Sequence, residues 1–337
     1  MKSGLGWIRR LWRGEEGLLG AVARTLLFPA EGLYRLAISV RNQCYHFGVF
    51  PDEKMSIPVI SVGNLAVGGT GKTPISAWFV SQLSKSGRQV ALVIRGYGLD
   101  EVDLHSSWNS DALLVVNAQR ARGIDQAVAM GADVAVLDDG FQHRHVQRDV
   151  DIVLLAAEHG IQNALLPRGL FREPVAALTR AHVILVTRKT AEVAEALQLE
   201  AEIAKVVPWA KYGQIHFRVS DWADLVGSSV EAPKGDVLVV TSIAEPESFL
   251  DMVRSEGLDP VITSSFPDHH EFSETDVLQI RGAARNRTLV TTEKDAVKLR
   301  RFFHLLPHCY VLRIQPEWES GREEVMALIS GALGENS

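Results

Sequence analysis

The sequence predicts an α/β protein of two domains, and three observations lead to this fold class. Short runs of β-branched and aliphatic residues alternate with helical patterns from about residue 55 onward. The runs are apolar throughout, which is typical of parallel strands that are covered on both faces. The chain has 337 residues, of which 46% are apolar and 23% charged, so it can form two modest cores, and disorder, collagen and a polytopic membrane protein are excluded.

The first domain is expected over 56–210 as a parallel sheet with helices between its strands. The expected strands are 58–62, 90–94, 113–116, 134–138, 152–155 and 183–187. Helical patterns at 73–85 and 123–130 fill two of the gaps. A polar segment at 211–235 follows, and we expect it to connect two domains rather than to form part of a core.

A second, smaller α/β domain is expected over 236–337, where the alternation resumes. Its expected strands are 237–241, 261–264, 288–291 and 309–312. Its expected helices are 246–255, 273–283, 294–303 and 322–332. About 100 residues are enough for an independent unit of this class.

The first 55 residues form an N-terminal basic amphipathic helical segment. Residues 1–50 carry seven Lys and Arg against three acids, a net charge of +4 that leaves −10 for the rest of the chain. Trp7, Ile8, Leu11 and Trp12 follow helical spacing, and a second helical pattern at 18–27 stops at Pro29. No apolar run is long enough to span a bilayer, and the charges fit a signal peptide poorly. The segment therefore either lies on an anionic lipid surface or docks on its own protein.

Composition also excludes several site classes. Cys44 and Cys309 lie far apart and outside any metal-ligand spacing, so we expect two thiols and neither a disulfide framework nor a zinc site. His143 and His145 have no cysteine partners for zinc. The charge of −10 beyond residue 50, without a platform of basic and aromatic residues, disfavours a nucleic-acid partner.

The sharpest chemical signal is a glycine-rich loop between an apolar strand and a helix. The segment from Ser61 to Thr73 reads Ser-Val-Gly-Asn-Leu-Ala-Val-Gly-Gly-Thr-Gly-Lys-Thr. Backbone N–H groups in such a loop close around phosphate oxygens, the lysine reaches the outer phosphates and the threonine hydroxyl binds Mg²⁺. The expected nucleotide-binding residues are Ala66, Val67, Gly68, Gly69, Thr70, Gly71, Lys72 and Thr73. One departure is Ala66, because the strict pattern has glycine at that position.

An acidic pair follows the expected strand at 134–138. A carboxylate placed there, about 65 residues after the loop, is where a nucleotide-bound Mg²⁺ is held, with Asp138 as the stronger candidate and Asp139 as a further ligand. The alternative is an Asp pair that caps the next turn. These features limit the reaction to nucleotide-driven phosphoryl transfer, hydrolysis or ligation, and they do not name the acceptor.

A family resemblance names one. Seven motifs, in order, resemble those of the tetraacyldisaccharide 4'-kinase family: Ser61-Val-Gly-Asn-Leu, Val67-Gly-Gly-Thr-Gly-Lys-Thr-Pro, Arg95-Gly-Tyr-Gly, Asp138-Asp-Gly-Phe-Gln-His, Leu166-Pro-Arg-Gly-Leu-Phe-Arg-Glu-Pro, Phe266-Pro-Asp-His and Thr292-Glu-Lys-Asp. The resemblance implies an ATP- and Mg²⁺-dependent kinase, peripheral at the cytoplasmic face of the inner membrane, with its active site in a cleft between two domains. Its implied substrate is a tetraacylated glucosamine disaccharide 1-phosphate of lipid A biosynthesis, which is phosphorylated at the 4'-hydroxyl, and an anionic membrane surface is its implied partner.

The resemblance also implies roles for residues outside the loop. Asp100 corresponds to the family's base and His269 to its supporting histidine, while Lys72 compensates charge during transfer. The usual loop before the base is missing, so Glu101 is the fallback for Asp100, and a surface turn acid is the alternative. By the same resemblance, Arg172 holds phosphate and Glu173 completes the magnesium shell, with an ion pair that anchors a loop as the alternative.

The segment Thr292-Glu-Lys-Asp295 leaves a second class of protein open. It begins a helix after a strand, so it first predicts an N-cap followed by early acids. It also partly mimics the Asn/Thr-Lys-x-Asp base reader of a GTP switch. A nucleotide-driven switch or metal-insertion chaperone is therefore the alternative to a lipid kinase, although Glu293 departs from the reader pattern.

Overall fold

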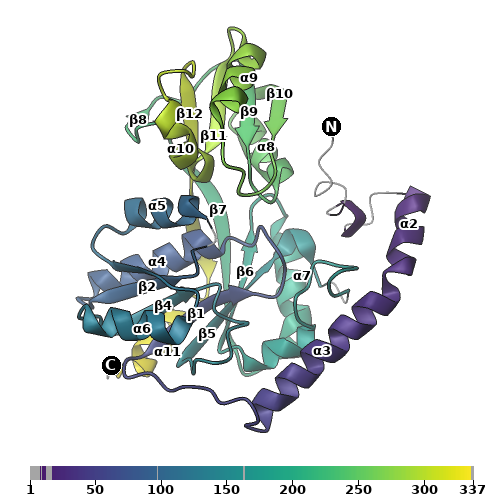
Figure 1. The fold of residues 1–337 in the computed structure, drawn as a ribbon, viewed down its shortest axis with the longest axis vertical. Helices are drawn as coiled ribbons and strands as arrows, with labels where there is room; N and C mark the ends of the chain where they lie inside the picture. The colour runs from purple at the N-terminus through teal and green to yellow at the C-terminus, as the bar shows by residue number, and fades with distance from the viewer. Residues whose placement is uncertain (1–7, 9, 13–16, 97, 162–163, 335–337) are drawn as a thin grey trace. The chain divides into compact units, whose positions relative to one another are not determined.

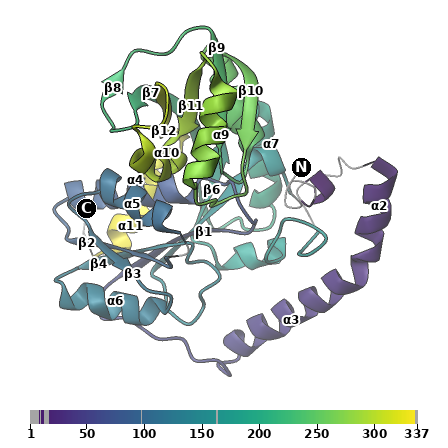
Figure 2. The same cartoon turned by 45° about the horizontal axis from the view of Figure 1, so that its top comes forward.

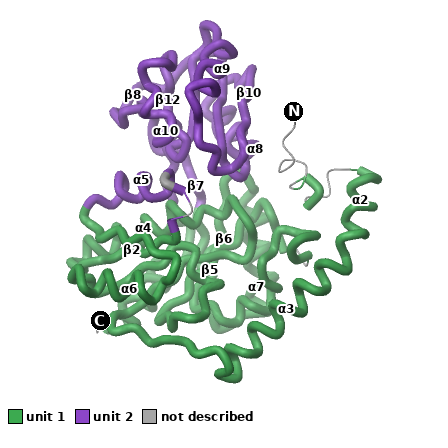
Figure 3. Tube along the Cα trace, in the orientation of Figure 1, with its two compact units in different colours: residues 1–95, 111–215, 318–337 green, residues 96–110, 216–317 purple. Residues whose placement is uncertain are grey.

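Figure 1 shows the computed structural model of the chain, which describes residues 8, 10–12, 17–96, 98–161 and 164–334. Contacts divide the chain into two compact units. Unit 1 comprises residues 1–95, 111–215 and 318–337, and unit 2 comprises 96–110 and 216–317 (Figure 3). Both expected α/β regions are present, so the fold class is confirmed.

The unit boundaries differ from the expected domain boundaries, and the segment expected to stand apart over 1–55 falls within unit 1. Residues 96–110, expected inside the first domain, belong to unit 2, and residues 318–337 belong to unit 1. The polar segment expected as a connection is largely strand β7 (Lys211–Asp224), which runs from unit 1 into unit 2, and it also contains the short strand β8 (Ser229–Val230). Strand β7 alternates buried and exposed residues over part of its length, which explains its polar composition.

The centre of unit 1 is a parallel sheet in the strand order β6-β5-β1-β4-β2-β3. Its strands are β1 (Val59–Asn64), β2 (Val90–Ile94), β3 (Leu113–Val116), β4 (Val134–Asp138), β5 (Val150–Ala156) and β6 (Val183–Arg188). Every residue of β1, β2, β4, β5 and β6 is buried, as the uninterrupted apolar runs predict. The register that pairs Val62 with Asp138 brings the carboxyl ends of β1 and β4 to the same edge.

Helices cover both faces of this sheet. They are α4 (Lys72–Lys85), α6 (Arg120–Ala129), α7 (Val193–Ala204) and α11 (Arg322–Ala332), with 3-10 turns η1 (Ala157–His159) and η2 (Val175–Arg180). Helices α4 and α6 lie on opposite faces in both views (Figure 1, Figure 2). Because α4 follows β1 directly, its N-terminus stands at the carboxyl edge of the sheet, where ligands of parallel sheets bind.

Unit 2 has its own parallel strands β9 (Asp236–Thr241), β10 (Asp259–Ser265), β11 (Thr288–Thr292) and β12 (Cys309–Ser320). Their order is β10-β9-β11-β12, followed by β7. The helices are α5 (Leu99–Trp108), α8 (Pro246–Ser255), α9 (Glu274–Ala284) and α10 (Glu293–Leu299), with the 3-10 turn η3 (Arg300–Phe302). Helix α5, which the sequence did not predict, packs against α10.

The N-terminal region forms two described helices, α2 (Gly17–Leu26) and α3 (Phe28–His46). Pro29 ends the first pattern as expected, but it lies in the first turn of α3, where a missing N–H costs nothing. Among the described residues, each helix is either too short or too polar to cross a bilayer.

Of the apolar residues expected on one helical face, Trp7, Ile8, Leu11 and Trp12, those that the structure describes do not form an exposed surface as a set. Trp7 lies outside the described residues. Leu11 is buried, and the Trp12 indole donates a hydrogen bond to the Pro167 carbonyl (2.7 Å), so these two residues dock on unit 1. Large apolar side chains are exposed instead along α2 and α3.

Candidate active site

The glycine-rich loop joins β1 to α4 with the conformation that phosphate binding needs. Gly68, Gly69 and Gly71 have φ values of 87°, 40° and 84°, a left-handed region that other residues rarely adopt. Successive N–H groups in such a turn form a concave site for anions, and the N-terminus of α4 adds the positive end of its dipole. The left-handed backbone of the loop therefore explains the glycine at each of these three positions.

The departure at Ala66 has a structural explanation. Ala66 forms a β-bridge with Phe171, and the N–H of Val67 donates to the carbonyl of Leu170 (2.9 Å). The entry to the loop is thus paired with the 170–171 segment, and the Ala66 side chain joins the hydrophobic core of unit 1. Ala66 is not among the positive-φ residues, so the position does not require glycine.

Three side chains that were not selected from the sequence hold the loop in place. Asn64 donates through Nδ2 to the hydroxyl of Thr70 (2.6 Å), and the Thr187 hydroxyl donates to the Thr70 carbonyl (3.1 Å). Lys189 donates through Nζ to the Gly69 carbonyl. Asn64 belongs to a motif quoted above. Thr187 lies at the end of β6 and Lys189 directly after it, and the pairing of β6 with β5 and of β5 with β1 places them beside the loop.

Lys72 and Asp139 form the charged centre of this site. Lys72 Nζ lies 3.5 Å from Asp139 Oδ1, and Arg172 contacts both Asp139 oxygens, at 2.8 and 3.0 Å. Partial burial raises the pKa of Asp139, but the Lys72 charge and the Arg172 hydrogen bonds outweigh it and hold the pKa well below its usual range. Asp139 is therefore ionised, and Arg172 contacts both its carboxylate and Asn64. The expected contact of Arg172 with phosphate stays a prediction.

Asp138 occupies the carboxyl end of β4 beside α4. It is buried, and its Oδ1 accepts a hydrogen bond from Ser76 (3.0 Å), one helical turn after Thr73. No group of three His, Cys, Asp or Glu side chains among the described residues is arranged to hold a metal ion. A magnesium site made of Asp138, Asp139 and the Thr73 hydroxyl needs no such group, because Mg²⁺ completes its shell with water and phosphate oxygens. The residues present therefore fit Mg²⁺.

Glu173 has a different environment. It is fully buried, and both its oxygens accept hydrogen bonds from Arg180 (3.1 Å), while Asn42 donates to Oε2 and Arg41 lies 3.2 Å from Oε1. Arg41 and Asn42 belong to α3, and Arg180 ends η2. These contacts match the alternative interpretation, an ion pair that anchors a loop, while the role of Glu173 in the magnesium shell stays a prediction.

Asp100 and His269 lie together in unit 2. His269 Nδ1 is 3.3 Å from Asp100 Oδ1, although 169 positions separate the two residues. The same oxygen accepts the backbone N–H of Glu101 (3.1 Å). Asp100 is only 1% exposed, so it is not the surface turn acid of the alternative interpretation. We call this pair the Asp–His dyad.

Two lysines of α10 determine the charge of the dyad. Lys294 and Lys298 lie 3.8 and 3.6 Å from Asp100 Oδ2. Burial raises the pKa of Asp100. The hydrogen bond from His269 and the charges of both lysines lower it by more, so that the pKa falls to about 2. The hydrogen bond with Asp100 raises the pKa of His269, against burial and the Lys294 charge. Asp100 is thus ionised at neutral pH.

The close approach within the dyad depends on Gly98. A β-carbon at position 98 would collide with Asp100 Oδ1 and lie 3.0 Å from His269 Nδ1. The glycine therefore leaves the space in which the two side chains meet. This explains the second glycine of the Arg95-Gly-Tyr-Gly motif in packing terms.

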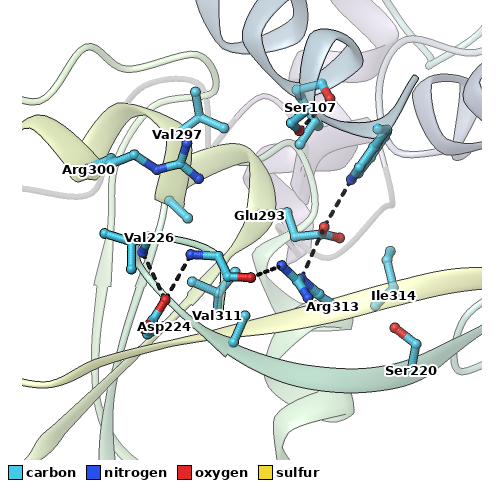
Figure 4. Close-up of a pocket in the computed structure, with 15 residues that line it drawn as sticks. Ser107, Ser220, Asp224, Val226, Glu293, Val297, Arg300, Val311, Arg313 and Ile314 are labelled. Carbon is cyan, nitrogen blue, oxygen red and sulfur yellow. Dashed lines mark hydrogen bonds and ion pairs between the residues drawn. The ribbon is translucent and has the colours of Figure 1, made fainter. Parts of the chain in front are cut away.

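The C-terminal end of α5 borders a cavity of about 470 Å³ within unit 2 (Figure 4). Its wall includes Glu293, which accepts the Trp108 indole N–H (3.0 Å) and faces Arg313. Burial raises the pKa of Glu293, although the Trp108 hydrogen bond opposes this. Asp100 lies in the first turn of α5 and Trp108 is its last residue, so the Trp108–Glu293 contact fixes the C-terminal end of this helix.

Comparison with known proteins agrees with this geometry. The family model described as tetraacyldisaccharide-1-P 4'-kinase matches residues 23–109 and 100–333. A tetraacyldisaccharide 4'-kinase of Anaeromyxobacter dehalogenans is 37% identical over 96% of this chain and 94% of its own. One of Chlorobaculum tepidum is 34% identical over 90% and 96%. The crystal structure of LpxK from Aquifex aeolicus in complex with ATP shares the fold, with a TM-score of 0.73 and 24% identity over 92% of this chain and 99% of that one. The chain belongs to the tetraacyldisaccharide 4'-kinase family.

Proposed function

We propose that this chain transfers the γ-phosphate of ATP to the 4'-hydroxyl of a tetraacylated glucosamine disaccharide 1-phosphate, a step of lipid A biosynthesis. The observation that carries the proposal beyond nucleotide binding is the Asp–His dyad, at 3.3 Å. A phosphate-binding loop serves switches and kinases alike, whereas an oriented carboxylate and imidazole supply a base for an acceptor hydroxyl. Membership of a kinase family supports the same reaction.

The nucleotide residues would act by position and charge. The N–H groups of the 66–71 loop and Lys72 would hold the phosphates, and Thr73, Asp138 and Asp139 would hold Mg²⁺. A bound Mg²⁺ supplies compensation for the charge that spreads over the transferred phosphoryl group. Arg172 favours the ionised form of Asp139 and holds its carboxylate in place through two hydrogen bonds.

In this proposal Asp100 is the base, and His269 orients it. Asp100 Oδ1 is occupied by His269 and by the Glu101 N–H, whereas Oδ2 accepts no hydrogen bond from the described residues. The ammonium groups of Lys294 and Lys298, at 3.8 and 3.6 Å, balance the charge of Oδ2 without a hydrogen bond, so this oxygen keeps a lone pair for a substrate hydroxyl. The acceptor hydroxyl would release its proton to Oδ2.

We also propose that α2 and α3 hold the protein peripherally on an anionic lipid surface, at the cytoplasmic face of the inner membrane where ATP is available. Helix α3 has two faces. Glu31 and Asn42 bind unit 1, while Leu33, Leu36 and Val40, spaced one turn apart, are 50–71% exposed. Helix α2 adds Leu18, Leu19, Val22 and Leu26, with exposures of 50–83%. An apolar face of this kind, in a segment of charge +4, fits a membrane interface.

The alternative of a nucleotide-driven switch or metal-insertion chaperone is not favoured. Thr292 accepts the N–H of Asp295 as a helix N-cap, so the predicted cap is confirmed. The Glu293 and Lys294 side chains contact Trp108 and His269, which leaves the segment without the arrangement of a base reader. The negative charge beyond residue 50 disfavours a nucleic-acid partner, because it repels phosphate groups.

The test is transfer of ³²P from [γ-³²P]ATP to purified tetraacyldisaccharide 1-phosphate in detergent, compared with GTP as donor and with hydrolysis in the absence of acceptor. The proposal expects a labelled bisphosphorylated lipid and little hydrolysis without the lipid. ATP or GTP hydrolysis that is unaffected by the lipid, with no labelled product, would support the switch instead.

A further inference from the structure

The segment Thr292-Glu-Lys-Asp295 contributes more than a helix cap. Asp295 is fully buried and accepts hydrogen bonds from the backbone N–H and the hydroxyl of Ser242. It also pairs with Lys298 (3.0 Å). Asp295 and Lys298 are therefore committed to the interior of unit 2. Lys294 differs, because its side chain is 21% exposed and its ammonium group reaches the Asp–His dyad.

The ammonium group of Lys294 lies between the imidazole and a second carboxylate. Nζ is 3.1 Å from His269 Nε2, 3.4 Å from Glu101 Oε1 and 3.8 Å from Asp100 Oδ2. The shortest of these contacts is to the ring nitrogen that does not face Asp100. The imidazole is thus held at both nitrogens, by a carboxylate on one side and by an ammonium on the other.

These contacts determine where the imidazole carries its proton. A protonated lysine has three donors and no acceptor, so Nε2 must present its lone pair to Lys294. The remaining proton then lies on Nδ1 and is donated to Asp100 Oδ1. The opposite tautomer would set two lone pairs against each other at Asp100 and two protons against each other at Lys294.

We infer that Lys294 is a positioning residue that holds His269 as the neutral Nδ1–H tautomer, so that His269 donates to Asp100 and leaves Asp100 Oδ2 for the acceptor hydroxyl. The catalytic part of this inference rests on the proposed function. The tautomer itself follows from the contacts alone. Lys294 Nζ lies 3.8 Å from Asp100 Oδ2 but 3.1 Å from His269 Nε2, and in this proposal it acts through the imidazole.

The charged groups around His269 come from three segments. They are Asp100 and Glu101 of α5, Lys294 of α10, and Asp268 of its own loop, while Lys298 of α10 reaches Asp100. The two nearest of these groups oppose each other, because Asp100 raises the pKa of His269 and Lys294 lowers it. Removal of the Lys294 charge should therefore favour the imidazolium, which places a second proton on the ring and weakens Asp100 as a base.

Glu101 gives Lys294 a second partner. When a proton occupies His269 Nε2, the ammonium group must leave that nitrogen, and Glu101 Oε1 at 3.4 Å can receive it. The sequence made Glu101 the alternative to Asp100 as the base, whereas in this inference Glu101 binds the ammonium group of Lys294. It keeps the lysine charge near the dyad in both states of the imidazole.

The experiment measures the tautomer directly. Protein labelled with ¹⁵N-histidine, with His269 assigned from a His269→Gln spectrum, is titrated by NMR as wild type, Lys294→Met and Lys294→Arg. In wild type we expect a protonated Nδ1 and an unprotonated Nε2 at neutral pH. In Lys294→Met the His269 titration moves to higher pH, and kcat at pH 7 falls about tenfold with KM for ATP unchanged. The arginine variant, which keeps a charged donor, restores both.

Lys234→Met, which removes an exposed lysine of unit 2 away from the dyad, is the matched control and should leave spectrum and kcat unchanged. Lys294→Gln makes the same test of charge if Lys294→Met does not fold. An Nε2–H tautomer in wild type, or an unmoved His269 titration in both variants, overturns the inference. If the titration moves but Asp100→Asn keeps full kcat, the tautomer inference stands and the proposed base is wrong.

Discussion

Asn42 of α3 donates a hydrogen bond through Nδ2 to Oε2 of Glu173, at 3.1 Å across 131 positions of sequence. The neighbouring Arg172 is also held by α3, because the Tyr34 hydroxyl donates to its carbonyl (3.0 Å). Arg172 in turn binds Asp139. The helix with the exposed apolar face is therefore joined through two consecutive residues to the carboxylate beside Lys72.

The first prediction concerns Glu173. Glu173→Gln removes a fully buried negative charge and leaves Arg41 and Arg180 without it, so we expect the melting temperature to fall by about 5 °C or more. The concentration of Mg²⁺ that gives half-maximal activity should not change. Thermal denaturation and Mg²⁺ titration measure the two effects, with the exposed Glu256→Gln as control. A normal melting temperature with a greatly raised Mg²⁺ requirement would make Glu173 a metal ligand after all.

The second prediction concerns the loop. Lys72→Ala and Thr73→Ala should each lower kcat by about 10²-fold or more, because they remove charge compensation and a hydroxyl oxygen close to the transferred group. Phosphate transfer to the lipid is the assay, and circular dichroism checks the fold. The exposed Lys205→Ala in unit 1 should retain activity. Wild-type turnover in Lys72→Ala or Thr73→Ala would remove this loop from the active site.

The third prediction concerns the dyad and its pH dependence. Asp100→Ala and His269→Ala should each lower kcat by about 10²-fold with ATP affinity unchanged, and the double variant should be little worse than either single one. Additive losses, or a larger loss at Glu101→Ala, would place the base elsewhere.

The sign of the pH dependence follows from the two pKa shifts. Asp100, with a pKa of about 2, stays ionised throughout the accessible range, whereas the pKa of His269 is raised above 6.5. The rate should therefore fall as pH decreases through the His269 pKa, where an imidazolium forms beside Asp100. In His269→Gln this acidic limb should disappear from the neutral range. The measurement is the pH dependence of kcat in both proteins. If the acidic limb is unchanged in His269→Gln, a group other than His269 causes it.

The fourth prediction concerns the apolar face. A Leu33→Glu, Leu36→Glu double variant should sediment poorly with vesicles of anionic phospholipid, because it adds charge where α3 would enter the interface. Activity on detergent-dispersed substrate should be retained. The matched control is Leu197→Glu on α7, where a leucine that is 53% exposed lies outside α2 and α3. Equal vesicle binding by wild type and the double variant would exclude this face as the lipid contact, and added salt should weaken wild-type binding.

Regular elements were predictable where local pattern and burial agree. Strands 90–94, 113–116 and 134–138 and helices 246–255 and 322–332 have the expected bounds. Helix α5 was missed because its ten residues mix charged and apolar side chains and depend on packing against α10. Helix α3 was missed because Pro29 suggested an end and not a first turn. Helix 294–303 is in fact α10, which begins at Glu293 and gives way to the 3-10 turn η3 after Leu299.

The candidate site was predictable as far as its motifs are local. The loop and Lys72 occupy consecutive positions, and so do Asp138 and Asp139, so each set follows from one strand and the turn after it. The parallel pairing of β1 with β4 brings the two sets to the same edge of the sheet. Lys294 and His269 are 25 positions apart, and Lys294 and Glu101 are 193 apart. Packing of α5 against α10 brings Glu101 to Lys294, and the loop between β10 and α9 brings His269. Glu173 carried a motif signal that is compatible with an ion pair and with a magnesium ligand, and the structure adds the ion pairs with Arg41 and Arg180 that the sequence did not predict.

Residues 96–110 leave unit 1 after β2, contribute Asp100 and Trp108 to unit 2, and return before β3. This excursion determines how the protein can be divided or recombined. A fragment that begins at residue 216 would contain His269 and Lys294 without the carboxylate they flank, and its Glu293 would lose the Trp108 indole. A chimera of two homologues joined near residue 215 would likewise combine α5 of one parent with α10 of the other. Such a hybrid should regain activity when 96–110 is exchanged together with the second unit, which makes this short segment the natural crossover block for engineering the enzyme.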